Sequence, residues 1–109
     1  MELLKGTLDA MVLKALTWGP RHGYAVSRWI HGATNELLDV DDAALYQALH
    51  RLERRRLLES EWGLSENNRR AKYYALTAAG RAELESEVGA IRRYVDALLK
   101  VLNATGAGA

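Results

Sequence analysis

The sequence predicts a mainly α-helical fold with one small β-hairpin and a long C-terminal helix. Three observations indicate this class. Apolar residues recur at steps of three and four in several stretches, a two-residue period occupies the segment from Leu58 to Leu76, and heptad spacing begins after Ala78. The 109 residues suffice for one domain, or for one small domain with an appendage.

Composition excludes several classes of protein. Apolar residues make up 49% of the chain, which is too many for a disordered protein, and no run approaches the roughly 20 apolar residues that cross a bilayer. Met1–Lys5 lacks the basic and apolar regions of a signal peptide, so a cytoplasmic protein is expected. The absence of cysteine rules out disulfides, thiolate nucleophiles and cysteine-bound zinc.

The residues do not indicate an enzyme. His22, His31 and His50 fall on three different elements without the spacing of metal ligands. No nucleophile stands beside a base, and there is no glycine-rich phosphate loop. The sequence therefore predicts no catalytic residue, no metal site and no cofactor.

Two helices are expected in the first third of the chain. Thr7 suits the N-cap of a helix over residues 8–16, whose apolar stripe consists of Leu4, Leu8, Met11, Val12 and Ala15. Gly19 and Pro20 end this helix, and residues 21–23 form a short connection. Helical spacing resumes over residues 24–31, with a core stripe of Val26, Trp29, Ile30 and Ala33.

A third helix is predicted to begin near Asp41, because acidic side chains are favourable where the first turn exposes unpaired N–H groups. Its apolar stripe faces the core and consists of Leu45, Ala48, Leu49 and Leu52. The other face carries planar and cationic groups that are large enough to reach phosphates and base edges in a major groove. These residues are Tyr46, Gln47, His50, Arg51 and Arg54.

The period then changes from that of a helix to that of strands. Residues 58–62 and 73–76 alternate in polarity, and the segment Gly63–Arg70 between them is rich in turn-forming residues. The predicted hairpin has two asparagines and two arginines at its tip. The predicted elements follow the order of a winged helix-turn-helix: two helices, a third helix with a polar face and then a basic hairpin. The alternative is that this helix face and turn are only solvated.

The net charge of +1 does not by itself favour a nucleic-acid partner. Its distribution does, because the segment from His50 to Lys72 contains seven Lys or Arg against four acids. The segment from Gly32 to Asp42 contains four acids and no base. The positive charge is thus concentrated on the third helix and the hairpin.

The last helix is predicted to run from Ala78 to Asn103, with Thr77 as its cap. At 1.5 Å per residue it would be about 39 Å long, which exceeds what a core of this size covers. Its heptad seam, widened by a tyrosine, is expected to pack against a second copy of the chain: Leu84, Val88, Ile91, Tyr94, Val95, Leu98 and Leu102. The alternative is a core helix within one chain. The predicted division is residues 1–77 for DNA binding, 78–103 for dimerisation and 104–109 as a flexible tail.

Five segments, in this order and spacing, resemble the signatures of PadR-family transcriptional regulators. The resemblance runs from Leu3 to about Glu85. It implies a homodimeric bacterial winged-helix repressor that binds double-stranded DNA at an inverted-repeat operator. The segments are Leu4–Asp9, His22–Tyr24, Ala44–Glu53, Ser65–Tyr74 and Leu76–Gly80.

Carried over by position, the resemblance assigns DNA contacts to Tyr46 and His50 on the third helix and to Asn68, Arg69, Arg70 and Lys72 on the wing. Two positions depart from the family pattern. Gln47 replaces a common proline and offers a bidentate side chain that suits adenine. Arg56 stands where glycine often ends the helix, so a left-handed conformation there would cost about 1 kcal/mol.

Two further hypotheses stay open. Some members of the resembled family bind planar effectors between subunits, and here Trp18, Trp29 or Tyr94 could stack on such a hydrophobic ligand, although aromatic residues more often belong to the core. The second is that the winged helix docks an acidic protein partner instead of DNA. The low net charge supports that alternative.

Overall fold

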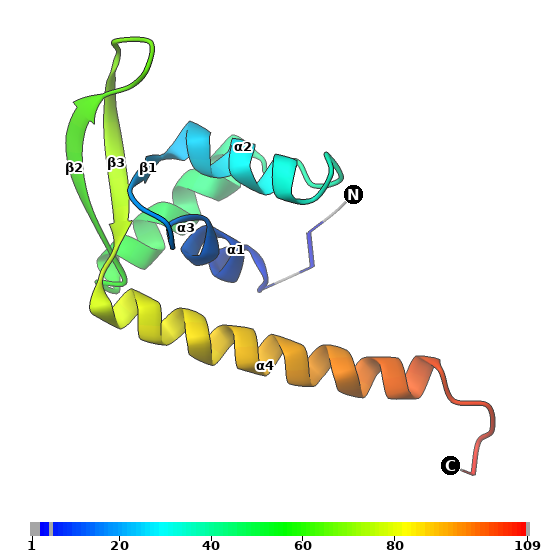
Figure 1. Ribbon diagram of the computed structural model, residues 1–109. Helices are drawn as coiled ribbons and strands as arrows, with labels where there is room; N and C mark the ends of the chain where they lie inside the picture. The colour runs from blue at the N-terminus through cyan, green and yellow to red at the C-terminus, as the bar shows by residue number, and fades with distance from the viewer. Residues whose placement is uncertain (1–2, 5, 109) are drawn as a thin grey trace.

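The computed structural model describes residues 3–4 and 6–108, which contain four α-helices and three β-strands (Figure 1). The predicted N-terminal segment Met1–Lys5 is therefore described only at Leu3 and Leu4, and the predicted tail only to Gly108. The elements in order are α1 (Leu8–Ala15), β1 (Arg21–His22), α2 (Gly23–Ala33), α3 (Asp42–Arg54), β2 (Leu58–Leu64), β3 (Arg70–Leu76) and α4 (Ala78–Leu102).

The core lies between α1, α2, α3 and the sheet. α1 has a wider buried face than its sequence predicts, because Leu13 and Leu16 are buried along with Val12 and Ala15. Leu4 was expected on this face but is 74% exposed. The reason is local, since the amide of Thr7 and its hydroxyl both donate to the Leu4 carbonyl, so a turn precedes the helix and breaks its phase.

The prediction for α2 is confirmed in its centre and wrong at its end. Val26 and Ile30 are buried and Trp29 packs against the core, but Ala33 is exposed. Ala33 is the last residue of α2, and the core contacts of this helix stop at Ile30. The preceding connection also differs from expectation, because Arg21 and His22 form the short strand β1.

α3 follows the sequence prediction closely. The Asp41 carboxylate accepts a hydrogen bond from the Ala44 amide at 3.1 Å, which caps the helix. The four apolar residues of the predicted stripe are fully buried: Leu45, Ala48, Leu49 and Leu52. After the helix, Arg56 has a φ of 60°, which is the left-handed conformation anticipated from the missing glycine.

The sheet is antiparallel with the order β1-β3-β2. The predicted hairpin is confirmed, and its strands pair from Leu58 opposite Leu76 to Leu64 opposite Arg70. Strand pairing therefore extends beyond Trp62, into the segment expected to be the turn. β2, β3 and the connecting residues 65–69 form the wing, which rises from the helices in Figure 1. With α2 and α3, this completes a winged helix-turn-helix.

A short junction locks α4 to the end of α3. The Thr77 amide donates to the Leu57 carbonyl at 3.1 Å, and the Thr77 hydroxyl donates to the Arg56 carbonyl at 2.8 Å. The same hydroxyl oxygen accepts from the Gly80 amide at 3.0 Å, so Thr77 caps α4 as predicted. A Cβ atom at Gly80 would lie 2.1 Å from the Leu57 carbonyl oxygen, which explains why glycine stands there.

α4 makes the molecule elongated. Its 25 residues run under the helices and extend beyond them, and the overall extents are 61 × 29 × 22 Å (Figure 1). Leu84 packs against the core, whereas the C-terminal half of the helix is exposed. Among the residues described, no helix combines the length and the apolar character needed to cross a membrane.

Candidate nucleic-acid interface

The exposed side of α3 presents the side chains predicted to read DNA. Gln47, His50 and Arg54 are exposed, opposite the buried leucines of the same helix. Tyr46 lies at the edge of this face and is 43% exposed. Its ring rests on the first turn of α2, where a Cβ atom at Gly23 would lie 2.7 Å from the Tyr46 hydroxyl oxygen. Tyr46 therefore also packs against α2.

Backbone hydrogen bonds within residues 65–69 close the tip of the wing. The Ser65 amide donates to the Arg69 carbonyl and the Asn68 amide donates to the Ser65 carbonyl, both at 2.8 Å. Asn68 has a φ of 58°, a left-handed conformation that asparagine tolerates. This turn leaves Arg69 and Arg70 exposed, and the Arg70 guanidinium lies 4.4 Å from the centre of the Trp62 ring.

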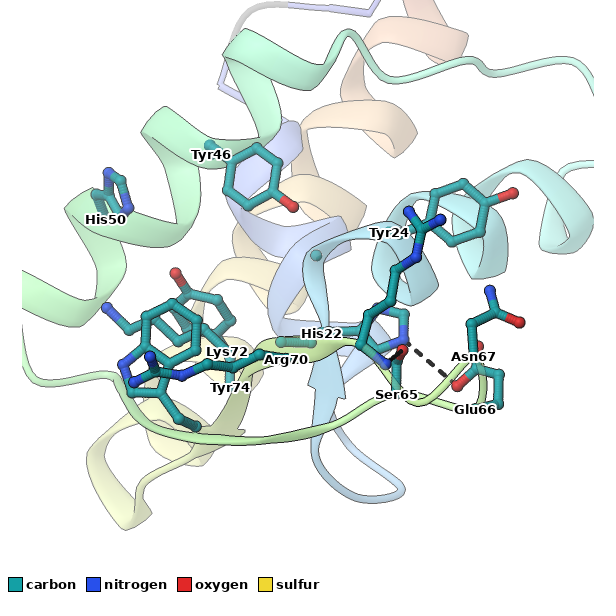
Figure 2. A pocket seen from close by; sticks show the side chains of 14 residues that line it. His22, Tyr24, Tyr46, His50, Ser65, Glu66, Asn67, Arg70, Lys72 and Tyr74 are labelled. Carbon is teal, nitrogen blue, oxygen red and sulfur yellow. Dashed lines mark hydrogen bonds and ion pairs between the residues drawn. The ribbon is translucent and has the colours of Figure 1, made fainter.

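A groove of about 580 Å³ separates α3 from the wing (Figure 2). Tyr46 and His50 line its α3 side, and Arg70 and Lys72 line its wing side. The groove thus brings together predicted residues that are far apart in the sequence. Gln47, Arg51, Arg54 and Asn68 are outside the lining of this groove, and the first three lie farther around α3.

The cations of this region differ in whether an acid neutralises them. Arg51 is held by Asp9 of α1 at 2.5 Å, Arg55 by Glu83 of α4 at 3.5 Å, and Lys72 by Glu53 at 3.4 Å. Within the part of the chain that the structure describes, no ion pair involves Arg54, Arg69 or Arg70. The uncompensated positive charge therefore lies on the exposed side of α3 and at the tip of the wing.

His22 joins the wing to the helix-turn-helix. Its Nδ1 accepts a hydrogen bond from the Ala25 amide at 3.1 Å and caps α2, while its Nε2 lies 3.6 Å from the Glu66 carboxylate at the wing tip (Figure 2). The pKa of Glu66 is lowered, first by its own backbone amide and then by His22. The sequence placed His22 in the short connection before α2. It gave no signal for the Glu66 contact, which joins elements distant along the chain.

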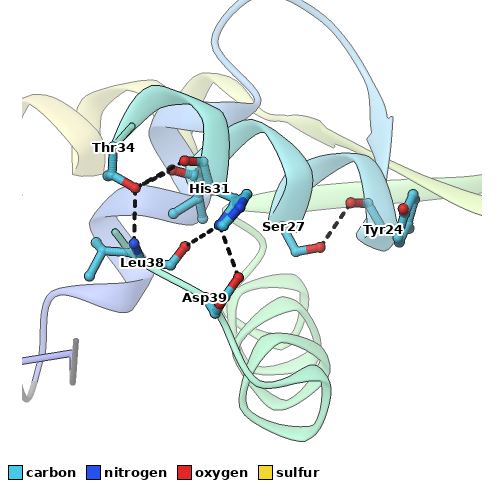
Figure 3. Close-up of polar contacts among 7 residues, drawn as sticks. Tyr24, Ser27, His31, Thr34, Leu38 and Asp39 are labelled. Carbon is cyan, nitrogen blue, oxygen red and sulfur yellow. Dashed lines mark hydrogen bonds and ion pairs between the residues drawn. The ribbon is translucent and has the colours of Figure 1, made fainter. Parts of the chain in front are cut away.

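The loop before α3 is held by His31 (Figure 3). The His31 Nδ1 lies 3.1 Å from the Leu38 carbonyl oxygen and 2.9 Å from the Asp39 carboxylate. Because both neighbours are acceptors, Nδ1 carries a hydrogen. The loop also contains Asn35 and Glu36 at φ values of 52° and 67°, so His31 and Thr34 hold a chain path that is intrinsically unfavourable. These contacts place the start of α3.

The predicted dimerisation residues divide along α4. Leu84 packs on the core of its own chain, and Val88 and Ile91 are half-buried. The remainder are exposed: Tyr94 67%, Val95 42%, Leu98 38% and Leu102 67%. In the residues described, no cluster of three or more His, Cys, Asp or Glu side chains could hold a metal ion.

Comparison with known proteins gives consistent matches. Residues 12–86 match the family model described as the transcriptional regulator PadR-like family. A transcriptional regulator from Clostridium thermocellum is 28% identical with a TM-score of 0.80, over 88% of this chain and 90% of that one. A PadR family transcriptional regulator from Eggerthella lenta is 29% identical with a TM-score of 0.79, over 93% of this chain and 86% of that one.

A more distant match is Bacillus subtilis PadR, whose structure is a complex with operator DNA. It shares the fold at a TM-score of 0.67 and 20% identity, over 75% of this chain and 46% of that one. The resemblance drawn from the sequence motifs is thus confirmed by the family match. Members of this family are transcriptional regulators and not enzymes. Because the match covers residues 12–86 of 109, the chain belongs to the transcriptional regulator PadR-like family.

Proposed function

We propose that this protein is a sequence-specific DNA-binding regulator that acts as a homodimeric repressor on an inverted-repeat operator. The observation that carries the proposal is the uncompensated charge of Arg54 on the exposed side of α3 and of Arg69 and Arg70 at the tip of the wing. A helix in the major groove and a basic hairpin on the backbone beside it require this arrangement. The shared fold of Bacillus subtilis PadR, bound to operator DNA, supports it.

The contacts divide by chemistry. Gln47, His50 and Tyr46 are proposed to reach base edges, because their planar polar groups suit hydrogen bonding in the major groove. The phosphate contacts are assigned to Arg54, Asn68, Arg69 and Arg70. Arg51 and Lys72, which the sequence also places in this set, are held by Asp9 and Glu53 in the free protein.

The exposed part of α4 supports self-association. Its apolar residues cannot be covered by the core of the same chain, which ends near Leu84. A second copy with the same heptad seam would bury both surfaces and would set two α3 helices about one DNA turn apart. Occupation of such a site in the cytoplasm would exclude polymerase and repress transcription.

A planar effector remains part of the proposal. Trp18 is 62% exposed and its ring centre lies 5.4 Å from that of Trp29, at a tilt of 44°. Lys14 lies over Trp18 and also lines a groove of about 540 Å³ between α1 and α4. A flat apolar ligand would stack on this pair, so tryptophan fluorescence should change on titration with planar compounds.

The decisive experiment measures binding to the duplex upstream of the protein's own gene and to a scrambled duplex, at several salt concentrations. Arg69→Gln/Arg70→Gln should weaken both complexes alike and flatten the log–log salt slope by about two per protomer, since phosphate contacts carry no sequence information. Gln47→Ala should instead weaken only the specific complex, by about 1–3 kcal/mol.

The matched control is Arg93→Gln/Lys100→Gln, which removes two exposed cations from α4 and should leave both curves unchanged. If the wild-type protein shows a shallow salt slope and no preference between duplexes, DNA binding is refuted. The function would then be the alternative one, docking of an acidic protein on the wing.

A further inference from the structure

Glu53 connects α3 with both strands of the wing. Its Oε2 accepts a hydrogen bond from the Ser60 hydroxyl of β2 at 2.5 Å, and its Oε1 lies 3.4 Å from the Lys72 ammonium of β3. The hydrogen bond from Ser60 is the main reason why the pKa of Glu53 is lowered, and the bond and charge of Lys72 lower it further. The carboxylate is therefore charged, and both of its oxygens contact the middle of the wing.

Lys72 is held on more than one side. The side chains of Lys72 and Glu53 are only 33% and 30% exposed, and the ammonium lies 5.5 Å from the centre of the Tyr74 ring. A pair that is partly withdrawn from solvent is screened by salt less than an exposed one. Arg69 and Arg70, only a few residues away on the same hairpin, have no acid partner among the described residues.

We propose that Glu53 is a positioning residue for DNA recognition, because it holds Lys72 toward α3 and keeps this cation off the phosphate backbone. The inference rests on the proposed DNA binding and refines it. A cation on a phosphate strengthens binding to every sequence equally. Because Glu53 keeps the Lys72 ammonium from the phosphates, it limits the affinity for non-specific DNA. The exposed face of α3 then discriminates between DNA sequences. Lys72, counted among the DNA contacts from the sequence, is thereby removed from that set.

The test is a set of salt titrations on a scrambled duplex, with the whole chain. Glu53→Gln keeps an oxygen that accepts from Ser60 but releases Lys72. It should steepen the log–log slope by about 0.9 per protomer, which is about a threefold larger loss of affinity between 50 and 200 mM salt. Lys72→Gln alone should leave the wild-type slope unchanged, and Glu53→Gln/Lys72→Gln should restore that slope.

Glu59→Gln is the matched control. Glu59 is an exposed carboxylate on β2, forms no ion pair among the described residues, and its loss changes the net charge by the same amount. It should leave the slope unchanged. The inference is overturned if Glu53→Gln behaves like this control, or if Lys72→Gln flattens the wild-type slope as the removal of Arg69 does.

A measurement without DNA tests the pairing itself. Titration of the Glu53 carboxyl by NMR should give a midpoint below that of an ordinary glutamate, and Lys72→Gln should raise it. If the Glu53 midpoint equals that of an ordinary glutamate and does not change in Lys72→Gln, the inference is overturned even if every variant binds DNA. A salt-insensitive wild-type protein would refute the proposed function, and the inference with it. A salt-steep wild type unaffected by Glu53→Gln refutes the inference alone.

Discussion

Gly80 shows how one residue fixes the contact between two helices. A side chain there would run into the Leu57 backbone, and backbone cannot move aside without disturbing the end of α3. Gly80→Ala is therefore expected to destabilise the protein by about 1–3 kcal/mol, as overpacking usually does. Denaturant unfolding monitored by circular dichroism measures this change.

Gly89 provides the internal control for that prediction. It lies on the same helix, and an added Cβ would meet only the end of the long, exposed Arg93 side chain, at 3.3 Å. Gly89→Ala should consequently stabilise the protein by about 0.5–1 kcal/mol through helix propensity. A Gly80→Ala variant that unfolds at the wild-type midpoint or above it would show that Gly80 is not closely packed.

At the scale of elements, the sequence pattern predicted those features that are determined within a single helix or hairpin. The buried stripe of α3, the caps at Asp41 and Thr77 and the hairpin follow from local patterns, and the structure confirms them. The strand β1 was missed because two residues carry no period, and its pairing with Tyr73 and Tyr74 depends on tertiary contact.

The same limit applies to the candidate interface. The sequence shows which side chains α3 and the wing can present, because exposure follows from helical phase. It does not show which of these cations an acid neutralises. The pairs of Arg51 with Asp9 and Lys72 with Glu53 join different elements, so no local pattern encodes them. The sequence therefore indicates which side chains the candidate interface presents, but it leads to too many free cations among them.

Where α1, α3 and α4 meet, acids crowd together. Burial raises the pKa of Glu87, repulsion from Glu83 and Asp9 raises it further, and Arg55 opposes both. The folded state thus prefers protonated Glu87. Its favourable contribution is complete below the ordinary value of 4.5 and is lost as pH rises from there through the raised pKa.

Glu87→Gln should consequently stabilise the protein at pH 7 and make little difference below pH 4. Partial exposure keeps the gain below about 1 kcal/mol. Denaturant unfolding between pH 4 and pH 8, at one protein concentration, measures it. Glu85→Gln, an exposed acid on the same helix, should give a profile parallel to wild type. A Glu87→Gln profile that is also parallel would exclude the buried-acid explanation.

For the whole molecule, the central prediction concerns the exposed seam of α4. Leu98→Glu places a charge in the proposed interface and should convert a dimer to a monomer in light scattering coupled to gel filtration. Loss of the second half-site contact should then reduce operator affinity by about 100-fold. Lys100→Gln changes the charge equally on the opposite side of the helix and should leave a dimer. If the wild-type protein is a monomer, the exposed seam of α4 is not a dimer interface.

The junction between Arg56 and Gly80 has a mechanical consequence. It ties the residues that follow α3 to the start of α4 through main-chain carbonyls and one threonine. In the proposed dimer, this junction would fix the separation and the relative orientation of the two α3 helices. Inserting one base pair between half-sites rotates one of them by about a tenth of a turn. A dimer with this fixed geometry would not follow that rotation. The protein would therefore discriminate between half-site spacings as strictly as between base sequences.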